Sequence, residues 1–239
     1  MRLAVFQCPV MRDDPAGVTR HVARALAAAG GDSVDLAVFT ETFLLGHAYD
    51  AKVIAARADR APAAIAAFCA AMKDVATTIV LGTFERCGPA IVNAALVIER
   101  GTIRGRYAKM HPNEPGVTAG DAVPIFAKND MPFGINICAD ANHPGTAQRV
   151  ADGGAMLIVY PLDNLLPSQV AERWRLRSVD NLVARARQTG CWIASADVVG
   201  KTDSARSFGC SAIVRPDGTI AARVPEGVAG VACYDIIPR

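Results

Sequence analysis

Three side chains that could take part in nucleophilic catalysis stand where predicted strands end. Cys138 directly follows the apolar run 133–137, Glu41 follows an apolar run that begins at residue 36, and Lys109 follows the predicted strand 103–107. The ends of strands commonly display active-site residues. A free thiol has a pKa of about 8.5 and is mostly protonated at neutral pH, so a nucleophilic cysteine needs a base nearby. The set therefore contains a nucleophile, a carboxylate and a cation.

Taken singly, each of these residues has an ordinary alternative. Cys138 could be a buried structural thiol, Glu41 a solvated loop charge and Lys109 one more exposed lysine. They become informative together, because all three lie at the ends of predicted strands that could open on one edge of a sheet. The elements that carry them decide whether they meet.

The chain alternates short β-branched apolar runs with longer alanine-rich amphipathic stretches, which is typical of layered α/β architecture. Strands are predicted at 3–8, 36–39, 78–84, 93–98, 103–107, 133–137, 156–160, 192–196, 210–214, 219–224 and 228–234. Helices are predicted at 18–29, 62–75, 145–153 and 171–188, with Pro62 in the first turn of the second one. Turns near residues 100 and 217 indicate antiparallel hairpins, so the sheets are expected to be mixed.

Three stretches together resemble the three motifs of the nitrilase superfamily, the carbon-nitrogen hydrolases, in order and spacing. They are LAVFTE at 36–41, GRYAKMH at 105–111 and FGINICAD at 133–140. Further similarity is found at Pro144, Gly154, Ala155, 184–186 and 208–218. The resemblance extends over nearly the whole chain and implies one carbon-nitrogen hydrolase domain, 1–239. It also implies a four-layer αββα sandwich with mixed β-sheets.

The resemblance implies a catalytic triad of Glu41, Lys109 and Cys138, with Glu114 as a second glutamate in the loop after Lys109. Cys138 would attack an amide to form a thioester, and Glu41 would move the protons. Lys109 and the backbone N–H after Cys138 would hold the oxyanion, while Glu114 would position the substrate or the lysine. No cofactor enters this scheme. The expected substrate is a small amide that releases ammonia; a nitrile or an N-carbamoyl compound remains an alternative.

The sequence also departs from the usual motifs around the cysteine. Thr40 replaces a proline before the first glutamate, and Ala139 replaces a larger residue after Cys138. The segment NHPG at 142–145 stands where Arg-Phe-Pro-Glu is common. The arginine that could hold a substrate carboxylate is thereby lost. A neutral or amine-bearing amide is therefore expected over a carbamoyl acid, unless Arg173 or Arg175 reaches the site from the following helix.

Three alternative hypotheses about the function remain open at this point. A papain-like hydrolase would use His111 or His143 as its base. An acyltransferase of the same superfamily would pass the thioester to an amine instead of water. A catalytically silent protein would keep the fold and bind partners without turnover, although the retained Glu41, Lys109 and Cys138 argue against it.

Composition limits the partners and the compartment. The 239 residues carry 25 basic and 23 acidic side chains, a net charge of +2, which argues against nucleic acid. The longest uncharged runs are far shorter than the ~18–20 residues of a membrane span, and no signal peptide is expected. Seven scattered cysteines without a CxxC pair indicate a reducing cytoplasm, and four unpaired histidines predict no metal site. The family resemblance implies a homodimer or larger homo-oligomer.

Overall fold

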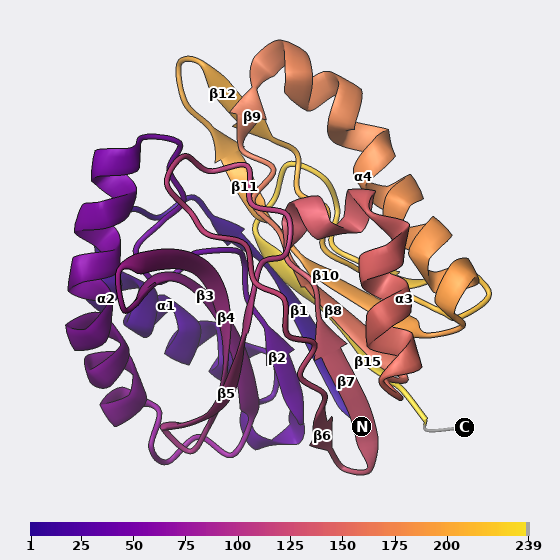
Figure 1. Ribbon diagram of the computed structural model, residues 1–239. Helices are drawn as coiled ribbons and strands as arrows, with labels where there is room; N and C mark the ends of the chain where they lie inside the picture. The colour runs from indigo at the N-terminus through magenta and orange to yellow at the C-terminus, as the bar shows by residue number, and fades with distance from the viewer. Residues whose placement is uncertain (238–239) are drawn as a thin grey trace.

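Two β-sheets lie face to face in the computed structural model of the protein, which describes residues 1–237 (Figure 1). Helices α1 (Pro15–Ala28) and α2 (Ala51–Ala71) cover the outer face of the first sheet. Helices α3 (Pro144–Asp152) and α4 (Ser168–Thr189) cover the outer face of the second. This arrangement confirms the predicted αββα sandwich.

The first sheet holds both ends of the described chain. Its strands are β1 (Arg2–Pro9), β2 (Leu36–Val38), β3 (Thr78–Cys87), β4 (Ala90–Glu99), β5 (Thr102–Ala108), β9 (Leu166–Pro167), β11 (Val198–Lys201), β12 (Ala205–Ser207) and β15 (Gly230–Asp235). They run in the order β5-β4-β3-β2-β1-β11-β12-β9, and β15 also pairs with β1. β1, β2 and β3 are parallel, whereas β3, β4 and β5 form antiparallel hairpins. The predicted mixed pairing is therefore confirmed.

The second sheet comes mainly from the later part of the chain. Its strands are β6 (Phe126–Lys128), β7 (Met131–Ile135), β8 (Leu157–Pro161), β10 (Trp192–Ala196), β13 (Ala212–Val214) and β14 (Ile220–Arg223). Their order is β14-β13-β10-β8-β7-β6. Because β7, β8 and β10 are parallel, their carboxyl ends open on one edge of the sheet.

Apolar side chains of both sheets interdigitate in one core. Leu3, Val5 and Leu36 of the first sheet belong to the same buried cluster as Phe133 and Leu157 of the second. Strands that are covered on both faces read as nearly continuous apolar runs, as these do. The core therefore fixes how the two sheet edges meet.

The prediction for the second helix is wrong at its start. α2 begins eleven residues before Pro62, at Ala51, and the proline lies inside the helix. The signal is Asp50, whose side chain accepts hydrogen bonds from the backbone N–H groups of Lys52 and Val53. That cap stabilises the first turn, and the helix tolerates the one backbone hydrogen bond that Pro62 cannot make.

Short strands outside the core were missed. β6, β9, β11 and β12 have three, two, four and three residues, and the sequence analysis assigned none of them. Their burial is mixed, so they carry no period-2 pattern. Within residues 1–237, none of the helices is both long and apolar enough to cross a membrane.

Candidate active site

The four predicted site residues come together where the two sheets meet. Glu41 lies in the turn after β2, Lys109 directly after β5, and Glu114 in the loop that follows it. Cys138 begins the 3-10 helix η2 (Cys138–Asn142) after β7 of the second sheet. The Glu41 N–H donates to the carbonyl of Leu162, which follows β8, so a backbone hydrogen bond links the edges of the two sheets.

The Glu41 turn passes very close to β3. A Cβ atom at Gly82 would lie 2.2 Å from the backbone nitrogen of Thr42 and 2.6 Å from the carbonyl oxygen of Thr40. Only glycine permits this approach. The glycine thus positions the backbone on both sides of Glu41.

Lys109 forms the centre of a buried charge cluster. Its Nζ lies 2.7 Å from Oε1 of Glu41 and 2.8 Å from Oε1 of Glu114. The exposed fractions of Lys109, Glu41 and Glu114 are 3%, 1% and 4%. An ammonium has three N–H donors, so one remains for another acceptor.

The surroundings set different protonation states in this cluster. Burial alone would lower the pKa of Lys109, but the charges of Glu41 and Glu114 outweigh it and raise that pKa. Burial alone would raise the pKa of Glu114, but hydrogen bonding to His47 and the charge of Lys109 outweigh it and lower that pKa. For Glu41 burial prevails, and the pKa is raised. Glu41 is therefore the member of the cluster best suited to exchange a proton near neutral pH.

Glu41 has one oxygen free for that exchange. Its Oε1 accepts from Lys109 and from Nδ2 of Asn93, whereas Oε2 is buried and has no hydrogen-bond partner among residues 1–237. An unpaired buried carboxylate oxygen is costly unless a proton or a donor reaches it. After burial, the charge of Glu41 has the largest effect on the pKa of the Cys138 thiol, and it raises that pKa.

Cys138 occupies a strained backbone position. Its φ is 40°, which L-residues rarely adopt and which recurs at displayed nucleophiles. The turn is held by Asp140, which accepts hydrogen bonds from the Ile137 N–H, the His111 N–H and the Tyr107 hydroxyl at 2.8–2.9 Å. Two of these donors come from the stretch 107–111 and the third from the residue before Cys138, so Asp140 ties the turn of the thiol to the first sheet.

The Cys138 thiol is protonated at rest. Burial raises its pKa, and so does the charge of Glu41; the charge of Lys109 and a backbone hydrogen bond from Asp163 act in the opposite direction. Attack by this sulfur therefore requires transfer of its proton to a base.

Two polar residues of the cluster were missed in the sequence analysis. Nδ2 of Asn93, on β4, lies 2.8 Å from Oε1 of Glu41 and 2.8 Å from Oε1 of Glu114. Nε2 of His47 lies 2.9 Å from Oε1 of Glu114. Asn93 is a polar residue in a buried apolar strand, and this was the only local signal for it.

His47, Glu41 and Glu114 place one ligand atom each within 4.8 Å of one another. The Lys109 ammonium already bonds both carboxylates of that group. A metal ion would have to displace it, so we assign no metal to this cluster.

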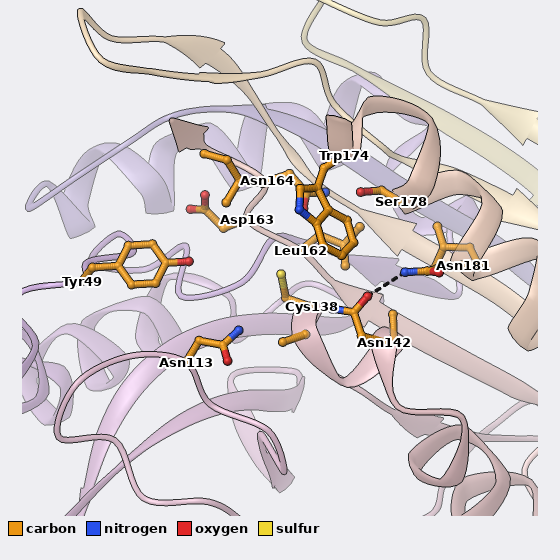
Figure 2. A pocket seen from close by; sticks show the side chains of 14 residues that line it. Tyr49, Asn113, Cys138, Asn142, Leu162, Asp163, Asn164, Trp174, Ser178 and Asn181 are labelled. Carbon is orange, nitrogen blue, oxygen red and sulfur yellow. Dashed lines mark hydrogen bonds between the residues drawn. The ribbon is translucent and has the colours of Figure 1, made fainter. Parts of the chain in front are cut away.

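A cavity of about 150 Å³ opens beside Cys138 (Figure 2). A cavity of that volume holds a ligand of roughly benzene size. Its lining residues come from loops beside the two sheets, from β9, from η2 and from α4: Tyr49, Asn113, Cys138, Ala139, Ala141, Asn142, Leu162, Asp163, Asn164, Leu166, Trp174, Ser178, Asn181 and Leu182. Among the described residues, no arginine, lysine or histidine lines it.

The histidines and arginines that the alternative hypotheses require lie outside the cavity of Cys138. His111 and His143 stack on each other at 3.6 Å and line a different surface hollow, not the cavity of Cys138. Arg173 is exposed, and Arg175 pairs with Glu226 at 2.7 Å. The two histidines that the papain-like alternative needs do not line the cavity of Cys138, and neither do the two arginines.

Comparisons with known proteins bear on the family and the fold. The family model described as carbon-nitrogen hydrolase matches residues 2–238. A hydrolase in the pqqF 5′ region of Pseudomonas protegens is 31% identical, covering 92% of this chain and 77% of its own length. A nitrilase of Pyrococcus abyssi is 26% identical over 68% of this chain, which spans 62% of the nitrilase. The NitN amidase structure superimposes with a TM-score of 0.87 at 21% identity, covering 99% of this chain and 93% of that one.

Proposed function

Because the chain belongs to the carbon-nitrogen hydrolase family, we propose that it is an amidase that releases ammonia from a small amide through a thioester on Cys138. The observation that carries this proposal is that Oε2 of Glu41 is buried and has no hydrogen-bond partner among the described residues. The charge of Glu41 also raises the pKa of the Cys138 thiol. A carboxylate with a raised pKa can accept the thiol proton and return it to the leaving group.

In the first half of the reaction, Cys138 attacks the amide carbon while its proton passes to Glu41. The negative oxygen that forms is stabilised by the remaining N–H of Lys109 and the backbone N–H of Ala139. Collapse of this intermediate breaks the C–N bond, and Glu41 gives its proton to the departing nitrogen. Ammonia leaves, and the acyl group stays on the sulfur.

In the second half, water replaces ammonia. Glu41, again a carboxylate, takes a proton from the water as its oxygen attacks the thioester carbon. The C–S bond breaks, the proton returns to the sulfur, and the free acid leaves. Glu114 keeps its charge throughout and fixes the position of Lys109.

The cavity supports an amide over a carbamoyl acid. An amino acid that carries a carbamoyl group presents a carboxylate, for which a guanidinium is the usual partner. No such side chain lines the cavity within residues 1–237. A nitrile would enter the same site through a thioimidate, and it remains the second candidate since a related chain is a nitrilase.

Ammonia release from small amides, ureido acids and nitriles tests the proposal, with Cys138→Ala as the inactive variant. Cys138→Ala should keep its fold, because it removes only a sulfur at a turn, and should lose turnover. Cys191→Ala is the matched control, since its thiol is buried beside the Ala155 carbonyl. It should lose stability and keep activity.

Mass spectrometry of the enzyme with a slow substrate should locate an acyl group on Cys138. An adduct on another cysteine, or activity that survives Cys138→Ala, would refute the assignment. Assays with added amines address the acyltransferase alternative, since transfer would give a substituted amide instead of the free acid.

A further inference from the structure

The cavity beside Cys138 contains a single charged side chain, and that charge is negative. Asp163 lines it together with neutral amides, hydroxyls and apolar groups. Figure 2 shows Asp163 on the same side of the cavity as Tyr49, whose hydroxyl is directed toward Cys138. A small cavity whose lining carries one charge, a carboxylate, favours a positively charged ligand group.

The Asp163 carboxylate has an unused oxygen. The residue is 8% exposed, and its one hydrogen bond joins Oδ1 to the Leu165 N–H at 3.1 Å. Oδ2 accepts no hydrogen bond, and in the described chain no lysine or arginine forms an ion pair with Asp163. A carboxylate this buried gains free energy when a cation reaches it.

Neighbouring cations are already engaged. A second hollow borders Asp163 and contains Arg12, His47 and Arg57. Arg57 bonds Asp13 and the carbonyls of residues 46 and 47. His47 bonds Glu114, and Arg12 is exposed to solvent. None of the three is bonded to Asp163.

Resting on the proposed amidase function, we propose that Asp163 binds a protonated amine in the acyl part of the substrate. The preferred substrates are then small amides of amino acids with a free amine and no carboxylate. Asp163 and Cys138 line the same cavity of about 150 Å³, so the carboxylate suits an amine a few bonds from the carbonyl of a substrate bound there. The rings of Tyr49 and Trp174 line the same cavity and can face an ammonium group.

Paired substrates of equal size test this assignment. β-Alaninamide and butyramide have the same number of heavy atoms and differ in one charged group. Glycinamide and propionamide form a second pair of this kind. Succinamate is an amide that carries a negative charge in place of the amine. We expect kcat/KM of the wild type to be highest for the cationic member of each pair and lowest for succinamate.

The decisive variant is Asp163→Asn. It keeps the oxygen that accepts from Leu165 and removes only the charge. Loss of a charge-assisted hydrogen bond should lower kcat/KM for β-alaninamide by about tenfold or more, while butyramide changes by less than about threefold. Asp180→Asn, on the exposed face of α4, is the matched control and should change neither substrate.

Three results would overturn the assignment. These are an equal loss for both members of a pair in Asp163→Asn, a wild type that prefers butyramide to β-alaninamide, and a wild type that prefers succinamate. If the wild type hydrolyses no amide, the proposed function is wrong. The role of Asp163 is then tested separately by measuring ligand binding. Thermal shifts of Cys138→Ala should then be larger with β-alaninamide than with butyramide, and Asp163→Asn should abolish that difference; equal shifts refute the site.

Discussion

The protonation states of Lys109, Glu114 and Glu41 follow from what each side chain touches. Lys109 bonds both carboxylates and keeps its proton, and Glu114 bonds Lys109 and His47 and stays ionised. Glu41 has a raised pKa and a free oxygen. Proton transfer is thereby assigned to Glu41, one of the two carboxylates that lie within hydrogen-bonding distance of Lys109.

This assignment predicts the pH dependence of activity. Glu41 must be ionised to accept the thiol proton, so kcat/KM should fall as the pH drops through a value above the ordinary pKa of a glutamate. On the alkaline side, the raised pKa of Lys109 keeps the oxyanion site charged. We expect a flat profile up to about pH 9, because Cys138 gains no thiolate there.

Glu41→Gln is the control for this profile. It should be almost inactive, and its residual rate should lack the acidic limb. A wild-type rate that climbs between about pH 8 and 9, where a free thiol ionises, would contradict proton transfer to Glu41.

Lys109→Ala should lose both activity and stability. The change leaves Glu41 and Glu114 buried without their shared cation, and breaking a buried ion pair costs about 3–5 kcal/mol. Urea unfolding at neutral pH measures the loss of free energy, and ammonia release measures activity. Lys201→Ala, at an exposed position on β11, controls for the loss of any lysine. An unchanged melting temperature in Lys109→Ala would refute the buried cluster.

At the scale of elements, the turn after β7 depends on Asp140. Its carboxylate holds three donors, and Asn can accept from fewer of them. We expect Asp140→Asn to cost about 1–3 kcal/mol of stability and to reduce kcat, since a buried donor is left unpaired and the thiol is no longer fixed. Tyr107→Phe removes one of the three bonds and should be milder by both measures. Equal effects of the two variants would show that Asp140 does not organise the turn.

The sequence predicted β2 and β7 because both are apolar and almost wholly buried, and it predicted β5, a partly exposed edge strand, from the hairpin turn near residue 100. The runs before Glu41 and Cys138 correspond to β2 and β7, and Lys109 follows β5 as expected. The resemblance to the family motifs also predicted Glu114, whose Oε1 lies 2.8 Å from Nζ of Lys109. These features are local, so a single sequence reveals them.

The remaining parts depend on contacts between distant segments. Asn93 and His47 are ordinary residues in their own segments and join the cluster only after β4 and the Glu41 turn pack together. The start of α2 was misplaced because Pro62 was given more weight than the Asp50 cap. Asp163 and Trp174 face one cavity only through the arrangement of β8 and α4.

At the scale of the molecule, the site exists only while the two sheets are packed together. Glu41 and Lys109 come from the first sheet, and Cys138 comes from the second. Their separation is set by the shared core and by the backbone hydrogen bond from Glu41 to Leu162. A homo-oligomer and a cytoplasmic location stay predictions.

This dependence predicts that the chain unfolds as one unit, as we also expect if the predicted single domain over 1–239 is right. Trp174 and Trp192 both lie in the later half of the chain, so tryptophan fluorescence reports on the second sheet and α4, while far-UV circular dichroism reports on all elements. Their urea midpoints should coincide with each other and with the loss of activity. Ile135→Ala, which truncates a side chain fully buried between the sheets, should move all three midpoints together and cost about 2–5 kcal/mol. A fluorescence transition separate from the circular dichroism transition would mean that the sheets fold independently and that the site forms only on docking.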